Sequence, residues 1–222
     1  MRPVVLESDF TDYYDQYFDS PSAVSPLKFS RFTNQGMKRS EILEFLARNG
    51  FSVPKYGKAK QVGKWAPHLR DSQLVVVYLD EESHRGENKL LMPIGEAIAK
   101  HPDCLAAEFL GARTDSSRGL RLVQVAMKYF WIELESANDW RASSGDVKTS
   151  VKKHGCGQQT RLFYPLFAID FVPVNVSGNE IRYAVDFSSA PLVGEHGIPD
   201  LLPPEVAAQE IKQMVNILYS RK

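Results

Sequence analysis

The stretch "PLFAIDFVPVNVSGNEIRYAVDFSSAP", residues 165–191, contains two apolar runs that each carry one aspartate in the middle. A polar tract around Ser177 and Gly178 separates the runs, which is typical of a tight turn between two strands. A hairpin that turns there places Asp170 and Asp186 opposite each other, or nearly so, on one face. Sheets usually hold valine or isoleucine at such positions, so the pattern indicates that the two carboxylates have a specific task.

Two interpretations of this aspartate pair are open on the residues alone. Ionised carboxylates on facing strands, with β-carbons roughly 4.5 to 5.5 Å apart, repel each other. A cation such as Mg²⁺ removes the repulsion, and Ser188 on the same face offers a further oxygen ligand. Alternatively the aspartates form structural ion pairs, for which the basic candidates are Arg121, Arg141 and Arg161.

Composition restricts the class of protein. The chain has 222 residues, of which 43% are hydrophobic and 24% charged, as in an ordinary globular protein. Lys+Arg and Asp+Glu balance at 27 each, which argues against general binding to nucleic acid. The longest apolar run, residues 74–79, has the length of a strand, and the first residues lack an apolar signal core. We therefore expect no membrane span and a cytoplasmic location.

Apolar periodicity predicts an α+β fold, mixed but with a largely antiparallel sheet flanked by helices. The elements expected in chain order are a helix at 37–49, strands at 74–80 and 104–110 with a short helix at 93–100 between them, a strand hairpin at 121–136, the aspartate hairpin, and a final helix at about 204–219. One domain is expected over residues 31–222.

The first 30 residues differ from the rest of the chain. Residues 7–19 combine regularly spaced aspartates with several aromatic side chains. Two interpretations fit this segment: an amphipathic helix that docks its aromatic side chains on the domain, or a segment that binds a protein partner.

The order of segments from residue 37 to about 212 resembles the ATP-grasp superfamily, whose members join a carboxylate to an amine or similar nucleophile through an acyl-phosphate. The segments that carry the resemblance are MKRSEILEFLARNGFSVP (37–54), CLAAEFL (104–110), RGLRLVQVAMKYFW (118–131), FAIDFV (167–172) and YAVDFSSAP (183–191). They are similar to the opening helix and strand of the family's domain, its adenine-side strand, its arginine-bearing strand pair and its closing metal hairpin.

The resemblance implies ATP and Mg²⁺ as cofactors, with a small-molecule or peptide substrate. Asp170 and Asp186 would be metal ligands, and Ser188 would stand where the family usually has asparagine. Arg121 would face the phosphates, and Glu108 would lie near the nucleoside.

Two departures from the family pattern concern the phosphates. Tyr78 occupies the position where the family usually has a lysine for the α-phosphate, and the following loop has one glycine. Lys89 or Arg85 in that charged segment would substitute as the phosphate contact. Arg141 would bind the acyl-phosphate or the substrate carboxylate. The expected catalytic set is therefore Arg121, Arg141 and Lys89.

A rival interpretation makes the chain a non-catalytic α+β protein-interaction module that has lost nucleotide chemistry. Tyr78 in place of lysine and Ser188 in place of asparagine favour it. The basic segment 151–161 reads as an ordinary surface loop, with a phosphate-contacting loop as its alternative.

Overall fold

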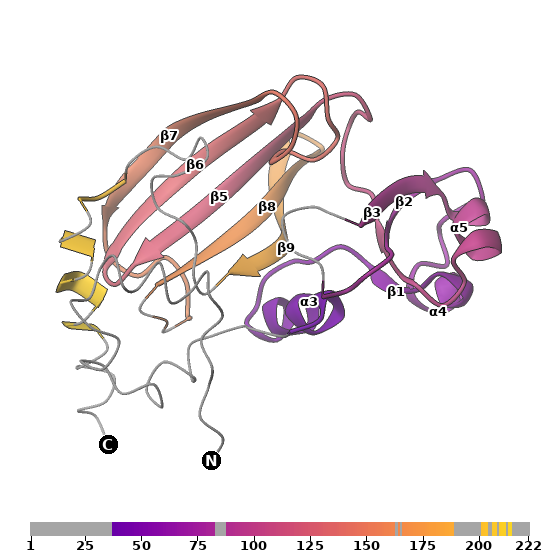
Figure 1. The fold of residues 1–222 in the computed structure, drawn as a ribbon, viewed down its shortest axis with the longest axis horizontal. Helices are drawn as coiled ribbons and strands as arrows, with labels where there is room; N and C mark the ends of the chain where they lie inside the picture. The colour runs from indigo at the N-terminus through magenta and orange to yellow at the C-terminus, as the bar shows by residue number, and fades with distance from the viewer. Residues whose placement is uncertain are drawn as a thin grey trace, which may run out of the picture.

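The computed structural model describes residues 37–82, 88–162, 164, 166–188, 201–203, 206–207, 209–211 and 213–214. These residues form two antiparallel sheets with a few short helices, an α+β fold (Figure 1). The elements in chain order are α3 (Arg39–Arg48), β1 (Tyr56–Lys58), the 3₁₀ helix η2 (Ala59–Gln61), α4 (Val62–Trp65), β2 (Leu74–Tyr78), β3 (Lys89–Pro93), α5 (Ile94–Lys100), β4 (Leu105–Glu108), β5 (Ser117–Val125), β6 (Lys128–Ser136), β7 (Val147–Cys156), β8 (Leu166–Val176) and β9 (Asn179–Ser188).

The small sheet has the strand order β1-β4-β2-β3. One of its faces packs against helical residues through a cluster that includes Val75, Val77 and Ile94 of α5. The other face carries Val76 and Tyr78 in a second cluster, which packs against aromatic side chains from outside the sheet. Because both faces are covered, β2 is a continuous apolar run rather than an alternating one, as expected for a strand buried on both sides.

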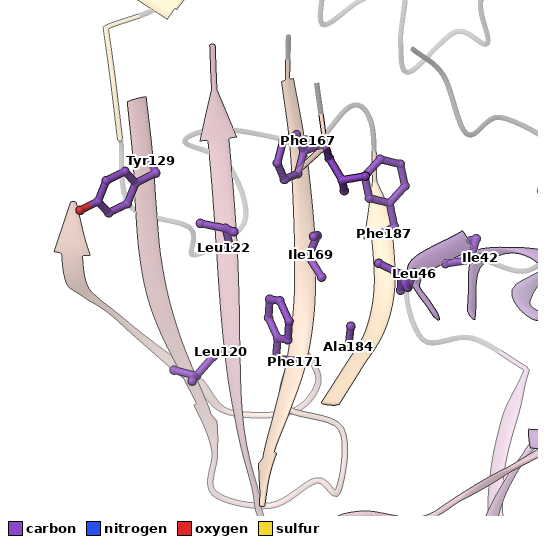
Figure 2. Close-up of a cluster of buried hydrophobic side chains, with 11 residues drawn as sticks. Ile42, Leu46, Leu120, Leu122, Tyr129, Phe167, Ile169, Phe171, Ala184 and Phe187 are labelled. Carbon is purple, nitrogen blue, oxygen red and sulfur yellow. The ribbon is translucent and has the colours of Figure 1, made fainter. Parts of the chain in front are cut away.

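The large sheet has the strand order β7-β6-β5-β8-β9. One of its faces holds a core cluster in which Ile169, Phe187 and their neighbours meet Ile42 and Leu46 of α3 (Figure 2). Helix α3 therefore packs on β9, and it lies between the two sheets (Figure 1). Its buried side chains recur every three or four residues, the spacing of one helical face.

The β8–β9 hairpin turns at Ser177 and Gly178, as the sequence predicted. Both residues have left-handed backbones, with φ of 51° and 86°, which suits the two-residue turn of a twisted hairpin. The register pairs Asp170 directly with Asp186, which confirms the predicted juxtaposition. A bulge follows between Asp170 and Phe171, a local irregularity typical of strands that direct side chains into a site.

Two segments differ from the sequence-based expectation. The prediction of a surface loop at residues 151–161 is wrong over most of its length, because residues 147–156 form β7 at the edge of the large sheet. Most side chains of β7 are exposed, so its sequence lacks the alternation of apolar and polar residues by which a strand is predicted. Lysines also suit a free sheet edge, where they oppose pairing with another chain. The single predicted sheet is two sheets, and every described strand pairing is antiparallel.

The helix predicted at about 204–219 is described at residues 206–207, 209–211 and 213–214, all of which are helical. Segment 1–30 and Arg85 lie outside the described residues. Among the helices that the structure describes, none has the length and apolar character needed to span a bilayer.

Candidate functional site

Asp170 is held by Arg121 from the neighbouring strand. The register places Arg121 of β5 directly opposite Asp170 of β8. The Arg121 Nε donates to Asp170 Oδ1 at 2.6 Å, and Nη2 donates to Oδ2 at 2.9 Å, so both carboxylate oxygens are engaged in a bidentate pair. The Asp170 charge raises the pKa of Arg121 above its ordinary range despite the burial of the guanidinium.

Asp186 is held by a different arginine, Arg39 at the first position of α3. The two groups form an ion pair, and Arg39 Nη1 also donates to the Val185 carbonyl oxygen at 3.2 Å. Burial alone would raise the pKa of Asp186, but the charge and hydrogen bond of Arg39 outweigh it and keep that pKa below its usual range. The structure therefore brings both aspartates into ion pairs, one of the two interpretations that the sequence left open.

Arg39 is a functional candidate that sequence reasoning missed. Its side chain is 2% exposed, although its partner Asp186 is 34% exposed. Its Nε is buried and has no hydrogen-bond partner among the described residues. A signal was present: Arg39 occupies the same helical stripe as Ile42, Leu43 and Leu46, and a cation on a buried stripe needs an ionic partner.

Lys89 approaches the same cluster from the small sheet. Lys89 of β3 pairs in register with Tyr78 of β2, and its Nζ lies 5.5 Å from the centre of the Tyr78 ring. The Arg39 guanidinium lies 5.6 Å from the same ring centre, so two cations lie beside the Tyr78 ring. Tyr78 stands where the ATP-grasp pattern usually has a lysine. This position therefore carries no positive charge of its own, and its ring lies beside two cations from other positions.

Lys89 is a cation without an ion-pair partner among the described residues. Burial and the charge of Arg39 lower the pKa of Lys89 from 10.5 to about 8, against the opposing effects of Asp186 and Asp170. Among the described residues, three cations therefore meet two carboxylates, which leaves one positive charge unbalanced at this junction of the two sheets. Such a cluster attracts an anion, and both burial and the charge of Arg39 disfavour the Lys89 ammonium until one is bound.

Arg141 lies beside the cluster and is held in place by its own loop. Its Nε and Nη2 donate to the Asp139 carboxylate at 2.9 and 2.7 Å, and its guanidinium lies over the Trp140 ring. Trp140 packs in turn on Phe109 of the small sheet. The charge of Arg141 contributes to the lowered pKa of Lys89, so these two predicted site residues act on each other.

Glu108 does not join the cluster. It pairs in register with Val75, whose side chain lies on the helix-covered face of the small sheet, opposite to the face that carries Tyr78. His68 is its partner there, 3.1 Å from Glu108 Oε1. The contact predicted between Glu108 and the nucleoside stays a prediction, but this side chain and Lys89 lie on different faces of the sheet.

Ser188, at the end of β9, lies on the face of the hairpin that carries the two aspartates. It pairs in register with Ala168, two residues along from the Asp170–Asp186 pair on each strand, and so lies on the same face as both aspartates. The predicted magnesium ligands Asp170, Asp186 and Ser188 are therefore together on one face of the hairpin.

The residues of this cluster fit a phosphate better than they fit a metal held by the protein. An unbalanced cation and a buried unsatisfied Arg39 donor are complementary to an anion. In contrast, both carboxylates already face guanidinium groups. The described residues contain no group of three His, Cys, Asp or Glu side chains able to hold a metal ion. The magnesium assignment stays a prediction.

Comparison with known proteins agrees with the fold. The sequence matches no family model and no curated protein. Among solved structures, the ATP-grasp ligase PsnB complexed with a minimal precursor superposes with a TM-score of 0.53 at 10% identity, over 86% of this chain and 62% of that one. PsnB complexed with precursor peptide PsnA2 and AMPPNP gives a TM-score of 0.52 at 9% identity, over 86% and 62%.

These similarities confirm an ATP-grasp-like α+β fold for this chain, as the sequence motifs predicted. The chain spans less than two thirds of the length of PsnB. At such low identity the likeness concerns the fold alone, and the activity must be argued from the site residues.

Proposed function

We propose that this chain is an ATP-dependent, ligase-like protein that holds the phosphates of ATP at the cluster of Arg39, Lys89 and Arg121. The observation that carries the proposal is the unbalanced positive charge of Lys89, which faces the aspartate hairpin of an ATP-grasp-like fold. A triphosphate supplies the missing negative charge, and guanidinium and ammonium groups are its usual binding partners.

The finer part of the proposal is an acyl-phosphate reaction. In this chemistry a carboxylate oxygen of the acceptor attacks the γ-phosphorus, ADP leaves with the bonding electrons, and an amine then displaces inorganic phosphate. Lys89 and Arg121 would stabilise the charge on the transferred group, since little covalent work is left to the protein. Arg141, held by Asp139 beside Lys89, would orient the acceptor carboxylate.

We infer that the acceptor is a peptide or a small molecule that carries a carboxylate. The precursor peptides in the PsnB complexes support the peptide class for that fold. The acceptor would approach from the side of Arg141, the cation of the site that is carried by a loop rather than by a strand or helix.

A second candidate function is a nucleotide-binding interaction module without turnover. The ion pairs favour it, because Asp170 and Asp186 are already neutralised and are poor candidates for chemistry of their own. The two candidates share the phosphate site and differ only in the reaction that follows.

Calorimetric titration with ATP tests the shared site. We expect the wild type and the exposed control Lys64→Met to bind ATP equally, and Lys89→Met to bind about a hundredfold more weakly, as the loss of a strong charge-assisted contact of about 2.7 kcal/mol implies. Equal binding by Lys89→Met would contradict the proposal. An ADP-release assay with mixtures of carboxylate-bearing peptides and amino acids then separates the two functions, because the interaction module binds ATP and releases no ADP.

A further inference from the structure

The two carboxylates that the family resemblance assigns to a metal each have a guanidinium partner in this chain. Asp170 uses both oxygens to accept hydrogen bonds from Arg121. Asp186 faces Arg39, and its Oδ1 also accepts a hydrogen bond from the Phe187 backbone N–H at 2.9 Å. A Mg²⁺ ion needs near-octahedral oxygen ligands at about 2.0 to 2.1 Å, so it would have to compete with Arg121 for both oxygens of Asp170, and only Oδ2 of Asp186 has no described partner.

Arg39 is built into the fold and is difficult to displace. Its backbone N–H donates to the Glu81 carbonyl oxygen at 2.9 Å, and Ser40 binds the Glu81 carboxylate through both its N–H and its hydroxyl. These contacts fix the first turn of α3 to the start of the β2–β3 connection. The guanidinium itself is confined between Asp186, the Val185 carbonyl and the Tyr78 ring.

The local charge also opposes a divalent cation. In the nucleotide-free site, a metal ion beside Arg39, Lys89 and Arg121 would add two positive charges to a cluster whose described residues already have one in excess. The repulsion between charges a few ångströms apart is several kcal/mol at the effective dielectric of a protein surface. The same surroundings stabilise an anion, because the guanidinium groups neutralise the aspartates and keep N–H donors for oxygen ligands.

We propose that this site binds the triphosphate of ATP without a divalent cation, and that Arg39 and Arg121 do the electrostatic work expected of the metal. The inference rests on the proposed ATP site and deepens it. It assigns to the aspartates the task of orienting two arginines, to Arg121 that of contacting phosphate oxygens, and to the buried Arg39 that of adding positive charge. The ligand class is thus a free nucleoside triphosphate rather than its magnesium complex.

Titration with ATP in EDTA and in excess Mg²⁺ tests the inference. We expect binding about tenfold tighter in EDTA than in excess Mg²⁺, because the metal converts ATP into the complex that the site does not take; equal dissociation constants under both conditions would overturn the inference. Binding that requires Mg²⁺, or that tightens tenfold with it, would overturn the inference and leave the ATP site standing. Binding under neither condition would refute the ATP site and the inference together.

For the variant Asp186→Asn, a metal-free phosphate site and a metal site predict opposite changes in the affinity for ATP. Asparagine keeps the shape and the acceptor oxygen for Arg39 but removes a negative charge beside the phosphates. We expect ATP in EDTA to bind about threefold or more tightly to this variant, whereas a metal site predicts loss of binding. Mn²⁺ titration followed by electron paramagnetic resonance provides a direct metal probe, and stoichiometric Mn²⁺ binding by the nucleotide-free wild type would also overturn the inference. Circular dichroism confirms that the variant folds.

Discussion

ATP binding to this chain should weaken steeply above pH 8. Burial and the charge of Arg39 lower the pKa of Lys89 from 10.5 to about 8. A bound phosphate favours the charged ammonium, so it raises this pKa again, and each binding event above pH 8 must take up close to one proton. The affinity for ATP should therefore fall by about tenfold for each pH unit above 8. Burial raises the pKa of the Tyr78 phenol, so Tyr78 does not mask this titration.

Calorimetry at pH 7, 8 and 9, in pairs of buffers with different protonation enthalpies, measures the proton uptake directly. We expect almost none at pH 7, about half a proton at pH 8 and about one at pH 9. In Lys89→Arg the guanidinium stays charged throughout, so the uptake should vanish while ATP binding persists. Identical proton uptake by the wild type and Lys89→Arg would refute the assignment of Lys89 to the phosphate site.

The same lowered pKa has a consequence for stability without ligand. Because the folded state disfavours the Lys89 ammonium relative to the unfolded chain, the charge reduces stability fully below about pH 8, and this cost disappears as the pH rises toward 10.5. Lys89→Met should accordingly be more stable than the wild type at pH 7, by about 1 kcal/mol or more, with the difference closing near pH 10. A constant difference across this range in urea unfolding would contradict the reasoning.

Three further predictions concern the structure around the site. Arg121→Met should lower the free energy of unfolding by about 2 kcal/mol, because it leaves the partly buried Asp170 without its bidentate partner, whereas Arg113→Met in an exposed pair should cause no measurable change in urea unfolding. Gly119→Ala should cost about 1 to 2 kcal/mol, since its β-carbon would lie 2.8 Å from a side chain of the β6–β7 loop, and ATP-dependent turnover should fall with the displaced loop. Glu81→Ala should cost about 1 kcal/mol in thermal unfolding by removing the acceptor at the start of α3, and an unchanged melting temperature would contradict this role.

The hairpin and its paired aspartates could be predicted because both signals are local. The turn residues Ser177 and Gly178 lie between two apolar runs, and a period of two residues then fixes which side chains share a face. The continuous apolar run of β2 and the helical stripe of α3 were visible for the same reason. Together with the family resemblance, these signals were enough to indicate the fold.

The partners of the aspartates could not be read from local pattern. Arg39 is separated from Asp186 by 147 positions, and only the packing of α3 on β9 brings them together. The direction of Glu108 depends on a register in which one residue more or less would turn it to the other face. Strand β7 was hidden because an exposed edge strand carries no apolar alternation.

A crystal structure with the non-hydrolysable analogue AMPPNP, grown in EDTA, tests the central claim most directly. The account predicts phosphate oxygens within about 3.2 Å of Lys89 Nζ and of a guanidinium nitrogen of Arg121 or Arg39, with the two aspartate–arginine pairs intact. A nucleotide bound elsewhere, or phosphates that reach the aspartates only through Mg²⁺ with the arginines displaced, would contradict it.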